Sequence, residues 1–103
     1  MPLYAIVGRD HPDALERRMA ARPRHIALGD TLAAEGKLLF GAALIEASQM
    51  KGSILIGRFD DRADVQRWLD IEPYVLDNVW ATVDVDEIRV GPSFAERYTP
   101  LGF

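Results

Sequence analysis

The chain contains no cysteine, which excludes disulfide bonds, thiolate nucleophiles, cysteine-ligated metals and iron–sulfur clusters. It also has no apolar run near the roughly 20 residues that a membrane helix needs, and the opening MPLYAIVGRDHPD does not resemble a signal peptide. The formal net charge of -4 lacks the basic excess that binding to nucleic acids or anionic membranes requires. These absences predict a cytoplasmic protein with no nucleic-acid and no membrane partner.

Motifs for several common chemistries are missing as well. Gly8, Gly29 and Gly36 are isolated, so the chain has no glycine-rich phosphate loop, and no serine lies in a nucleophile-elbow motif. With 2 histidines and no cysteine, the chain supplies few of the usual metal ligands, and we predict no metal and no cofactor.

What is present is the composition of a folded domain. The 103 residues are 49% hydrophobic and 27% charged, as is ordinary for globular proteins. A chain of this length fits one domain, which we place at residues 1–103.

Apolar spacing divides the chain into six expected elements. In order they are a strand at 3–8, a helix at 14–35, a strand at 37–45, a strand at 53–59, a helix capped by Asp60 and Asp61 and ended by Pro73, and a strand at 79–88. Residues 46–52 are expected to form the turn of a hairpin. The order predicts an α+β protein with the ferredoxin-like fold, in which two helices cover one face of a four-stranded antiparallel sheet.

Two local patterns add expectations about these elements. Pro23 interrupts the first helix, so we expect either a kink there or a second helix that starts at Pro23, while Gly36 should end the helix as a cap. In the last strand, strict alternation places Val83 and Val85 on one face and Trp80 on the other.

The sheet face away from the helices is expected to be apolar. Alternation in the strands at 3–8, 37–45 and 53–59 leaves hydrophobic side chains on both faces, more than a monomer usually exposes. Two copies packed sheet to sheet as a homodimer would cover this face. Alternatively, the tail at 91–103 folds over it with Phe94, Tyr98, Leu101 and Phe103, and both interpretations hold if the tail crosses the dimer.

His25 is the leading candidate for chemistry. It falls on an inward helical stripe, with Arg18 and Arg22 two turns and one turn before it. The other members of the stripe are Ala14, Ala21, Leu28 and Leu32. Arginines beside a histidine suit a small anionic ligand, and a histidine moves protons near neutral pH. The alternative is a histidine that is merely hydrogen-bonded at the edge of the core. The second histidine, His11, lies in a polar loop and is expected to be solvated or to cap a helix.

Carboxylates for His25 are available at the end of the second helix. Asp70 and Glu72 lie there, and both helices are expected on the same sheet face, so either side chain could approach His25. The alternative is that both are solvated residues at a helix end. Tyr74 either hydrogen-bonds a substrate or only packs.

Four segments resemble the YCII family of small dimeric α/β-barrel proteins. They are LYAIVGRD at the start, Arg22-Pro23-Arg24-His25, Glu35-Gly36-Lys37-Leu38 and Glu72-Pro73-Tyr74-Val75. The resemblance covers nearly the whole chain and implies a ferredoxin-like fold that pairs sheet to sheet in a homodimer. It also implies a His–Asp active site at His25, but the usual Asp-Pro-Tyr is replaced here by Glu72-Pro73-Tyr74, so Asp70 or Asp30 is an alternative partner.

The implied function is proton transfer on a small cyclic or aromatic molecule. One member of the family is similar to a dehydrochlorinase that acts on a chlorinated aromatic, and related barrels include muconolactone isomerases. The resemblance therefore favours an isomerase or lyase that uses His25 and Glu72, with Arg22, Tyr74 and Arg18 binding the substrate. The alternatives are a dimer that binds or senses a small ligand without chemistry, and a structural subunit.

Overall fold

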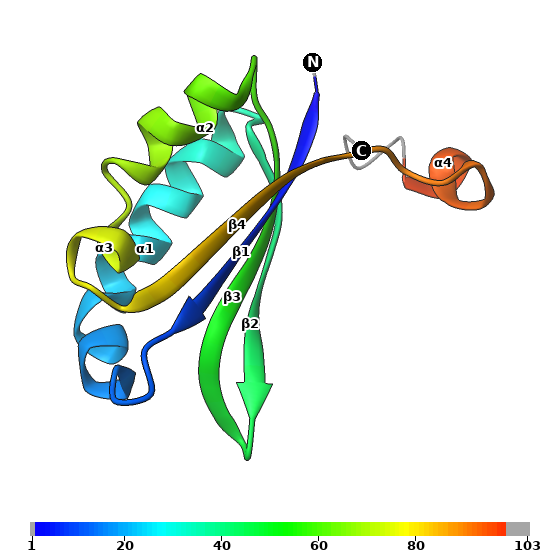
Figure 1. The fold of residues 1–103 in the computed structure, drawn as a ribbon. Helices are drawn as coiled ribbons and strands as arrows, with labels where there is room; N and C mark the ends of the chain where they lie inside the picture. The colour runs from blue at the N-terminus through cyan, green and yellow to red at the C-terminus, as the bar shows by residue number, and fades with distance from the viewer. Residues whose placement is uncertain (1, 99–103) are drawn as a thin grey trace.

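Four strands form one antiparallel sheet in the order β2-β3-β1-β4 (Figure 1). The strands are β1 (Leu3–Asp10), β2 (Leu38–Glu46), β3 (Gln49–Arg58) and β4 (Trp80–Ile88). The computed structural model describes residues 2–98 of the chain. The strand order and the alternation with helices confirm the predicted ferredoxin-like fold.

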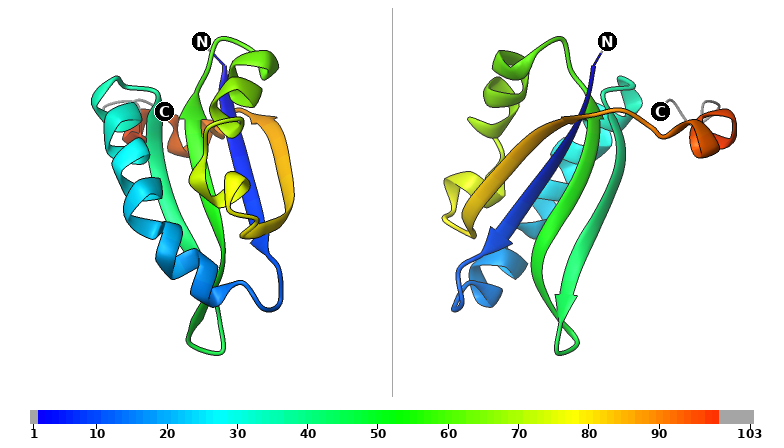
Figure 2. Two further views of the ribbon diagram at one scale, coloured as in Figure 1. Left: turned by 90° about the vertical axis from the view of Figure 1, so that its left-hand side faces the viewer. Right: turned by 45° about the vertical axis from the view of Figure 1, so that its right-hand side comes forward.

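The helices α1 (Leu15–Ala34), α2 (Arg62–Leu69) and the short α3 (Pro73–Leu76) cover one face of the sheet (Figure 2). The core lies between this layer and the sheet, where burial of each large apolar side chain stabilises the fold by about 1.5–3 kcal/mol. Its largest fully buried members are Tyr74, Phe59, Ile6, Glu72, Val65 and Val79. A glutamate in this set is unusual, because a buried carboxylate needs partners to offset its lost hydration.

Helix α1 runs without a break through Pro23, so the expected second helix beginning there is wrong. Pro23 lies on the exposed side of the helix, where water can replace the hydrogen bond that proline removes. The helix ends as predicted at Gly36, whose φ of 76° allows the Gly36 N–H to bond Ala33 and the Lys37 N–H to bond Leu32. Within residues 2–98, no helix combines the length and the apolarity needed to cross a bilayer.

The β2–β3 hairpin is tighter than the sequence suggested. Its loop consists of Ala47 and Ser48, with φ values of 50° and 67°, and Glu46 already pairs with Gln49. Two consecutive residues with positive φ make the turn whose twist matches that of the flanking strands. The expected seven-residue turn at 46–52 is therefore wrong, because most of that segment belongs to the two strands.

A bulge in β4 reverses the predicted orientation of Trp80. Arg9 pairs with Thr82 but Asp10 pairs with Trp80, so one extra residue of β4 lies between these pairs. The extra residue turns Trp80 onto the helix side of the sheet, the same side as Val83. There the indole covers Gly8, where an added Cβ would come within 2.3 Å of the ring.

Within residues 2–98, no helix packs against the opposite face of the sheet. Figure 1 and the right view of Figure 2 show the last helix, α4 (Pro92–Tyr98), standing apart from the sheet on that side. None of its residues is buried, and Phe94 is 50% exposed. The sequence analysis expected no helix in the tail, so the helix at 92–98 is a correction. Leu101 and Phe103, which were expected to help cover the face, lie outside the described residues.

Candidate active site

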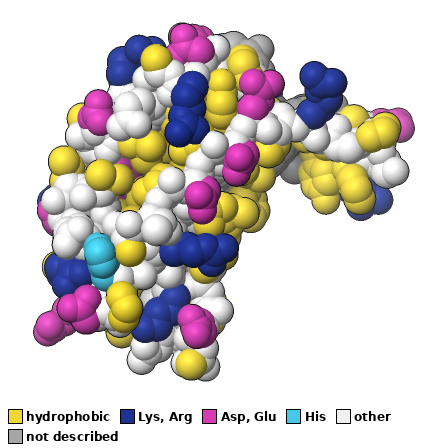
Figure 3. All heavy atoms as spheres, viewed as in Figure 1, with side chains coloured by type: hydrophobic (Ala, Val, Ile, Leu, Met, Phe, Trp, Pro, Cys, Tyr) yellow, Lys and Arg dark blue, Asp and Glu magenta, His cyan; other side chains and the backbone are white. Residues whose placement is uncertain are grey.

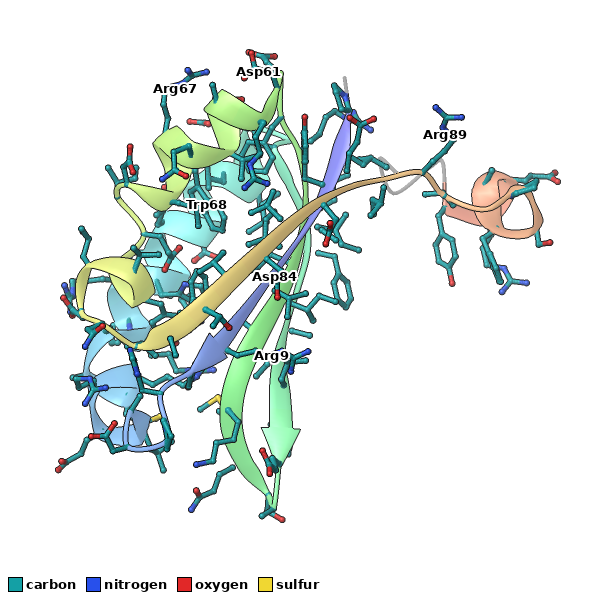
Figure 4. The ribbon with its side chains drawn as sticks, viewed as in Figure 1. Arg9, Asp61, Arg67, Trp68, Asp84 and Arg89 are labelled. Atoms are coloured by element: carbon teal, nitrogen blue, oxygen red, sulfur yellow. The ribbon has the colours of Figure 1, made fainter. Side chains whose placement is uncertain are left out.

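A pocket of about 410 Å³ opens between α1 and the strands β2 and β3. His25 lines it from α1, Ser53 from β3, and Trp68 from α2. Figure 4 shows Trp68 between α2 and the sheet. Glu72 and Tyr74 reach the same pocket from the start of α3, so α1, β3 and α3 bring polar side chains to one cavity.

His25 and Glu72 form a hydrogen-bonded pair in this pocket. The His25 Nδ1 and Glu72 Oε1 atoms are 2.6 Å apart, and the two side chains are 18% and 1% exposed. A carboxylate can only accept, so the geometry places the proton on Nδ1 and leaves Nε2 as the free nitrogen. This arrangement lets the imidazole exchange a proton at Nε2 while the carboxylate holds the ring.

The local sequence explains why Glu72 points inward. Pro73 is the first residue of α3, and a residue before proline is restricted to extended backbone, as the φ of -71° and ψ of 121° at Glu72 show. From this position the Glu72 side chain caps α3, because Oε1 also accepts from the Tyr74 N–H at 3.1 Å. One carboxylate oxygen thus ties α3 to His25 on α1.

An aromatic ring packs against the flat face of the His25 imidazole. The rings of His25 and Tyr74 are stacked, with centroids 4.0 Å apart and an interplanar angle of 15°. Trp80 meets Tyr74 edge to face, with centroids 5.6 Å apart. Burial raises the pKa of Tyr74 above its usual 10.0, although Arg18 and Arg22 oppose this, so the phenol keeps its proton at neutral pH.

Arg18 is already engaged by the protein. Its side chain is 3% exposed, and Nη1 donates to both oxygens of Asp10, at 3.0 and 3.2 Å. Nη2 donates to Ser53 Oγ at 2.8 Å, and the guanidinium lies 4.6 Å from the centre of the Tyr74 ring. Burial raises the pKa of Asp10, against the opposing attraction of Arg18. The sequence analysis singled out neither Asp10 nor Ser53.

Arg22 is the cation that remains available to a ligand. It is exposed, lines the pocket, and makes no hydrogen bond or ion pair with another residue of the described chain. Its positive charge is therefore not neutralised locally, unlike that of Arg18. Arg22 is suited to an ionised group of a ligand at the mouth of the pocket.

The alternative partners for His25 lie elsewhere. Asp70 ends α2 on an exposed turn and accepts from Gln66 Nε2 at 2.9 Å, so the expectation that it could replace Glu72 is wrong. Asp30 lines the pocket but is exposed and does not bond His25. The other histidine is His11, whose Nε2 lies 3.2 Å from Asn78 Oδ1. Between residues 2 and 98, no three acidic or histidine side chains gather as a metal site would require.

Sequence comparison finds relatives that align with most of this chain. Residues 2–89 match the model of the YCII-related domain. Protein YciI of Escherichia coli O6:H1 is 34% identical over 94 residues, which cover 84% of this chain and 96% of that protein. An uncharacterized protein of Haemophilus influenzae is 33% identical over 93 residues, which cover 84% and 95% of the two chains.

Comparison with solved structures returns the same fold. The 5-chloro-2-hydroxyhydroquinone dehydrochlorinase TftG of Burkholderia phenoliruptrix AC1100, in complex with 2,5-dihydroxybenzoquinone, superposes with a TM-score of 0.83 at 24% identity. The match covers 88% of this chain and 97% of that one. An antibiotic biosynthesis monooxygenase matches with a TM-score of 0.56 at 14% identity, over 89% of this chain and 100% of the other.

Proposed function

The chain belongs to the family of YCII-related domains, and on this basis we propose that it is a small-molecule enzyme in which His25 acts as general acid and base. Glu72 is its partner in this proposal. The observation that carries the proposal is the 2.6 Å hydrogen bond from His25 Nδ1 to a carboxylate that is 1% exposed. A bond to so deeply buried a carboxylate orients the imidazole and stabilises the imidazolium that forms when Nε2 takes a proton.

The reaction class follows from these groups. His25 Nε2 takes a proton from a carbon or hydroxyl of the substrate, and the electron pair of the broken bond moves into the ring. In an isomerisation, the imidazolium returns that proton to a different carbon. In an elimination, a leaving group such as chloride departs with its bonding pair, and the product carries one more double bond. A positioned general base contributes a factor of about 10²–10⁴ to such a step.

The substrate proposed for this site is a small cyclic or aromatic molecule that carries an anionic group. A pocket of about 410 Å³ suits a molecule of one ring, and the uncompensated Arg22 favours a negative charge at its mouth. The fold neighbour TftG, by its name, removes chloride from a chlorinated hydroxyhydroquinone, which supports the same class of substrate here. Because the chain has no cysteine, we expect it to work in a reducing cytoplasm.

The test is turnover of a panel that contains 5-chloro-2-hydroxyhydroquinone, other halogenated phenols and unsaturated lactones. Chloride release and ultraviolet absorbance report the two reaction types. We expect His25→Gln to lose at least 100-fold in kcat/KM. His11→Gln is the matched control, because it removes the other histidine of the chain and should keep full activity. Equal activity of His25→Gln and the wild type would contradict the proposal. Binding without turnover across the panel would favour the alternative of a ligand-binding or regulatory protein.

We also propose that the enzyme works as a homodimer, with a second copy covering the open sheet face. The strand registers place eight apolar side chains on that face: Leu3, Ala5, Val7, Phe40, Ala42, Leu44, Ile54 and Ile56. Phe40 alone is 47% exposed. Figure 3 shows hydrophobic atoms along the side of the molecule that faces α4, and on α4 itself. An apolar surface of this extent is typical of an interface.

Charges on the same face suit pairing between two copies. Arg9 of β1 points away from the helices, and the register places Asp84 and Asp86 of β4 on the same side (Figure 4). In a two-fold arrangement, the arginine of each copy can meet an aspartate of the other.

The dimer is tested by the mass in solution. Light scattering should give twice the 11.5 kDa of one chain for the wild type. Ile56→Glu, in the middle of the open face, should give a monomer because it would bury two charges between the sheets. Leu76→Glu is the control, since Leu76 is 62% exposed on the helix side. A wild type that runs as a monomer would contradict the proposal.

A further inference from the structure

The sheet side of the pocket holds polar groups that acid–base chemistry at His25 does not require. A buried network there consists of Arg18, Ser53 and Asp10. Arg18 and Ser53 are each 3% exposed, and the Asp10 side chain is 2% exposed. Arg18 donates to Asp10 through one nitrogen and to Ser53 through another. A buried network of this kind costs free energy unless its groups are satisfied, so its presence beside a pocket calls for a role.

Some polar groups in and beside this network make no hydrogen bond to the described residues and are available to a ligand. Ser53 Oγ accepts from Arg18 at 2.8 Å, and its own proton has no acceptor among residues 2–98. Within the same residues, Arg18 Nε is buried without a hydrogen-bond partner, and the Tyr74 hydroxyl makes no hydrogen bond to another described residue. All three residues line the same pocket as His25. Arg18 Nε can only donate, and the two hydroxyls can donate as well as accept, so a ligand oxygen that accepts hydrogen bonds matches all three groups.

The charge of the network determines which kind of acceptor fits. Asp10 neutralises Arg18, so this end of the pocket carries no net charge, in contrast to Arg22 at the mouth. An uncharged end that offers hydrogen-bond donors suits a carbonyl or hydroxyl oxygen rather than a carboxylate. The Tyr74 ring contacts both the His25 ring and the Arg18 guanidinium, which places the donors close to the proposed base.

Ser53 occupies the central position in this arrangement. Its neighbours across the sheet are Gly8 on β1 and Ala43 on β2, which bring no polar side chain beside the hydroxyl. Because Arg18 occupies a lone pair of Oγ, the hydroxyl proton must turn to another direction. Ser53 lines the pocket, so a ligand bound there can supply the acceptor for this proton.

We propose that Ser53 determines substrate specificity, by donating its hydroxyl proton to a carbonyl or hydroxyl oxygen of a small oxygenated ring bound beside His25. Asp10 and Arg18 are positioning residues that hold this hydroxyl. The inference rests on the proposed function of the same pocket and adds to it the substrate class. The substrate carries an uncharged oxygen at the sheet end and an ionised group toward Arg22.

The experiment is isothermal titration of the full-length protein with 2,5-dihydroxybenzoquinone, a ring that carries acceptor oxygens. We expect Ser53→Ala to weaken binding about tenfold, the usual effect of one lost hydrogen bond to a ligand. Ser53→Thr keeps the hydroxyl and should restore most of the affinity. Thr31→Ala is the control, because it removes a hydroxyl that bonds only its own helix and does not line the pocket. Thermal melts of each variant show whether the fold is intact.

The outcomes separate this inference from the proposed function. Equal affinity of Ser53→Ala and the wild type overturns the inference, whatever the activity of the His25 variants. No binding by the wild type also overturns it, because the probe represents the named ligand class. Weaker binding by folded Ser53→Ala with recovery in Ser53→Thr supports the inference, even if His25→Gln keeps full turnover and the proposed acid–base function fails. If Ser53→Ala does not fold, affinity of Ser53→Thr more than a hundredfold below the wild type overturns the inference.

Discussion

Replacing Glu72 by glutamine removes one negative charge from the candidate site and almost no volume. The glutamine oxygen can still accept from the Tyr74 N–H, so the cap on α3 survives and we expect the free energy of unfolding to fall by no more than about 1 kcal/mol. The amide does not stabilise an imidazolium at His25, and its NH₂ can turn toward Nδ1 and reverse the tautomer. We therefore expect kcat/KM to fall by about 10²–10⁴, which is roughly 3–5 kcal/mol of barrier.

Glu72→Ala provides the contrasting perturbation. It removes the cap bond, worth about 1 kcal/mol, and leaves a buried N–H without a partner, at a cost of about 1–3 kcal/mol. The expected loss of stability is therefore about 2–4 kcal/mol, which a domain with typical stability survives. The assay is kcat/KM for the panel compound that the wild type converts fastest, together with urea unfolding of each variant. The reasoning is refuted if folded Glu72→Gln keeps kcat/KM within twofold of the wild type.

Three further predictions concern single positions. Gly8→Ala should lower the free energy of unfolding by about 1–3 kcal/mol, because the new Cβ meets the Trp80 ring at 2.3 Å. Gly41→Ala, whose nearest contact is at 3.8 Å, should change the free energy of unfolding little, and urea denaturation measures both variants. A backbone hydrogen bond lowers the pKa of Asp64 below 3.8, so its ionised form favours the folded state. The stability advantage of the wild type over Asp64→Asn should be complete at neutral pH and shrink as the pH falls below 3.8; an advantage that persists in strong acid would disagree. Arg22→Gln should weaken binding of an anionic ring about fivefold at low salt and less at high salt, and an effect independent of salt would argue against a charge interaction.

The fold could be predicted from the sequence because short local patterns mark its helices and strands. The apolar run at 3–8, the glycine cap after α1 and the alternation in the last strand each depend on neighbours only a few residues away. The pairing of His25 with Glu72 was also within reach, because both predicted helices lie on the same face of a ferredoxin-like sheet and Glu72 lies at the end of the second one. Choosing Glu72 over Asp70 required coordinates, since both lie at the same helix end.

What the sequence could not show depends on pairing between distant segments. The bulge opposite Arg9 and Asp10 shifts the register of β4 by one residue, and no local pattern marks it, so Trp80 was placed on the wrong face. Ser53 and Asp10 were missed for a similar reason. Each is one polar residue at a strand position, and its significance appears only when α1 brings Arg18 against both. A polar residue within an otherwise apolar strand was the available signal.

The helices α3 and α4 were also unforeseen: Pro73 was expected to end the second helix, but that helix ends at Leu69 and Pro73 begins α3. A four-residue helix depends on its cap and on packing against α1 more than on propensity. The sequence PSFAERY has helix-forming residues, but proline and glycine on either side of it favour an irregular tail.

The central claim is that His25 presents a free Nε2 to the pocket while Nδ1–H is held by Glu72. Long-range ¹H–¹⁵N correlation spectra of the protein labelled in its histidines measure this directly, and the other histidine, His11, serves as an internal reference. The structure predicts that neutral His25 is protonated at Nδ1 and unprotonated at Nε2, and that this preference is lost in Glu72→Ala. A His25 protonated at Nε2 in the wild type, or a tautomer that does not respond to Glu72, would contradict the account.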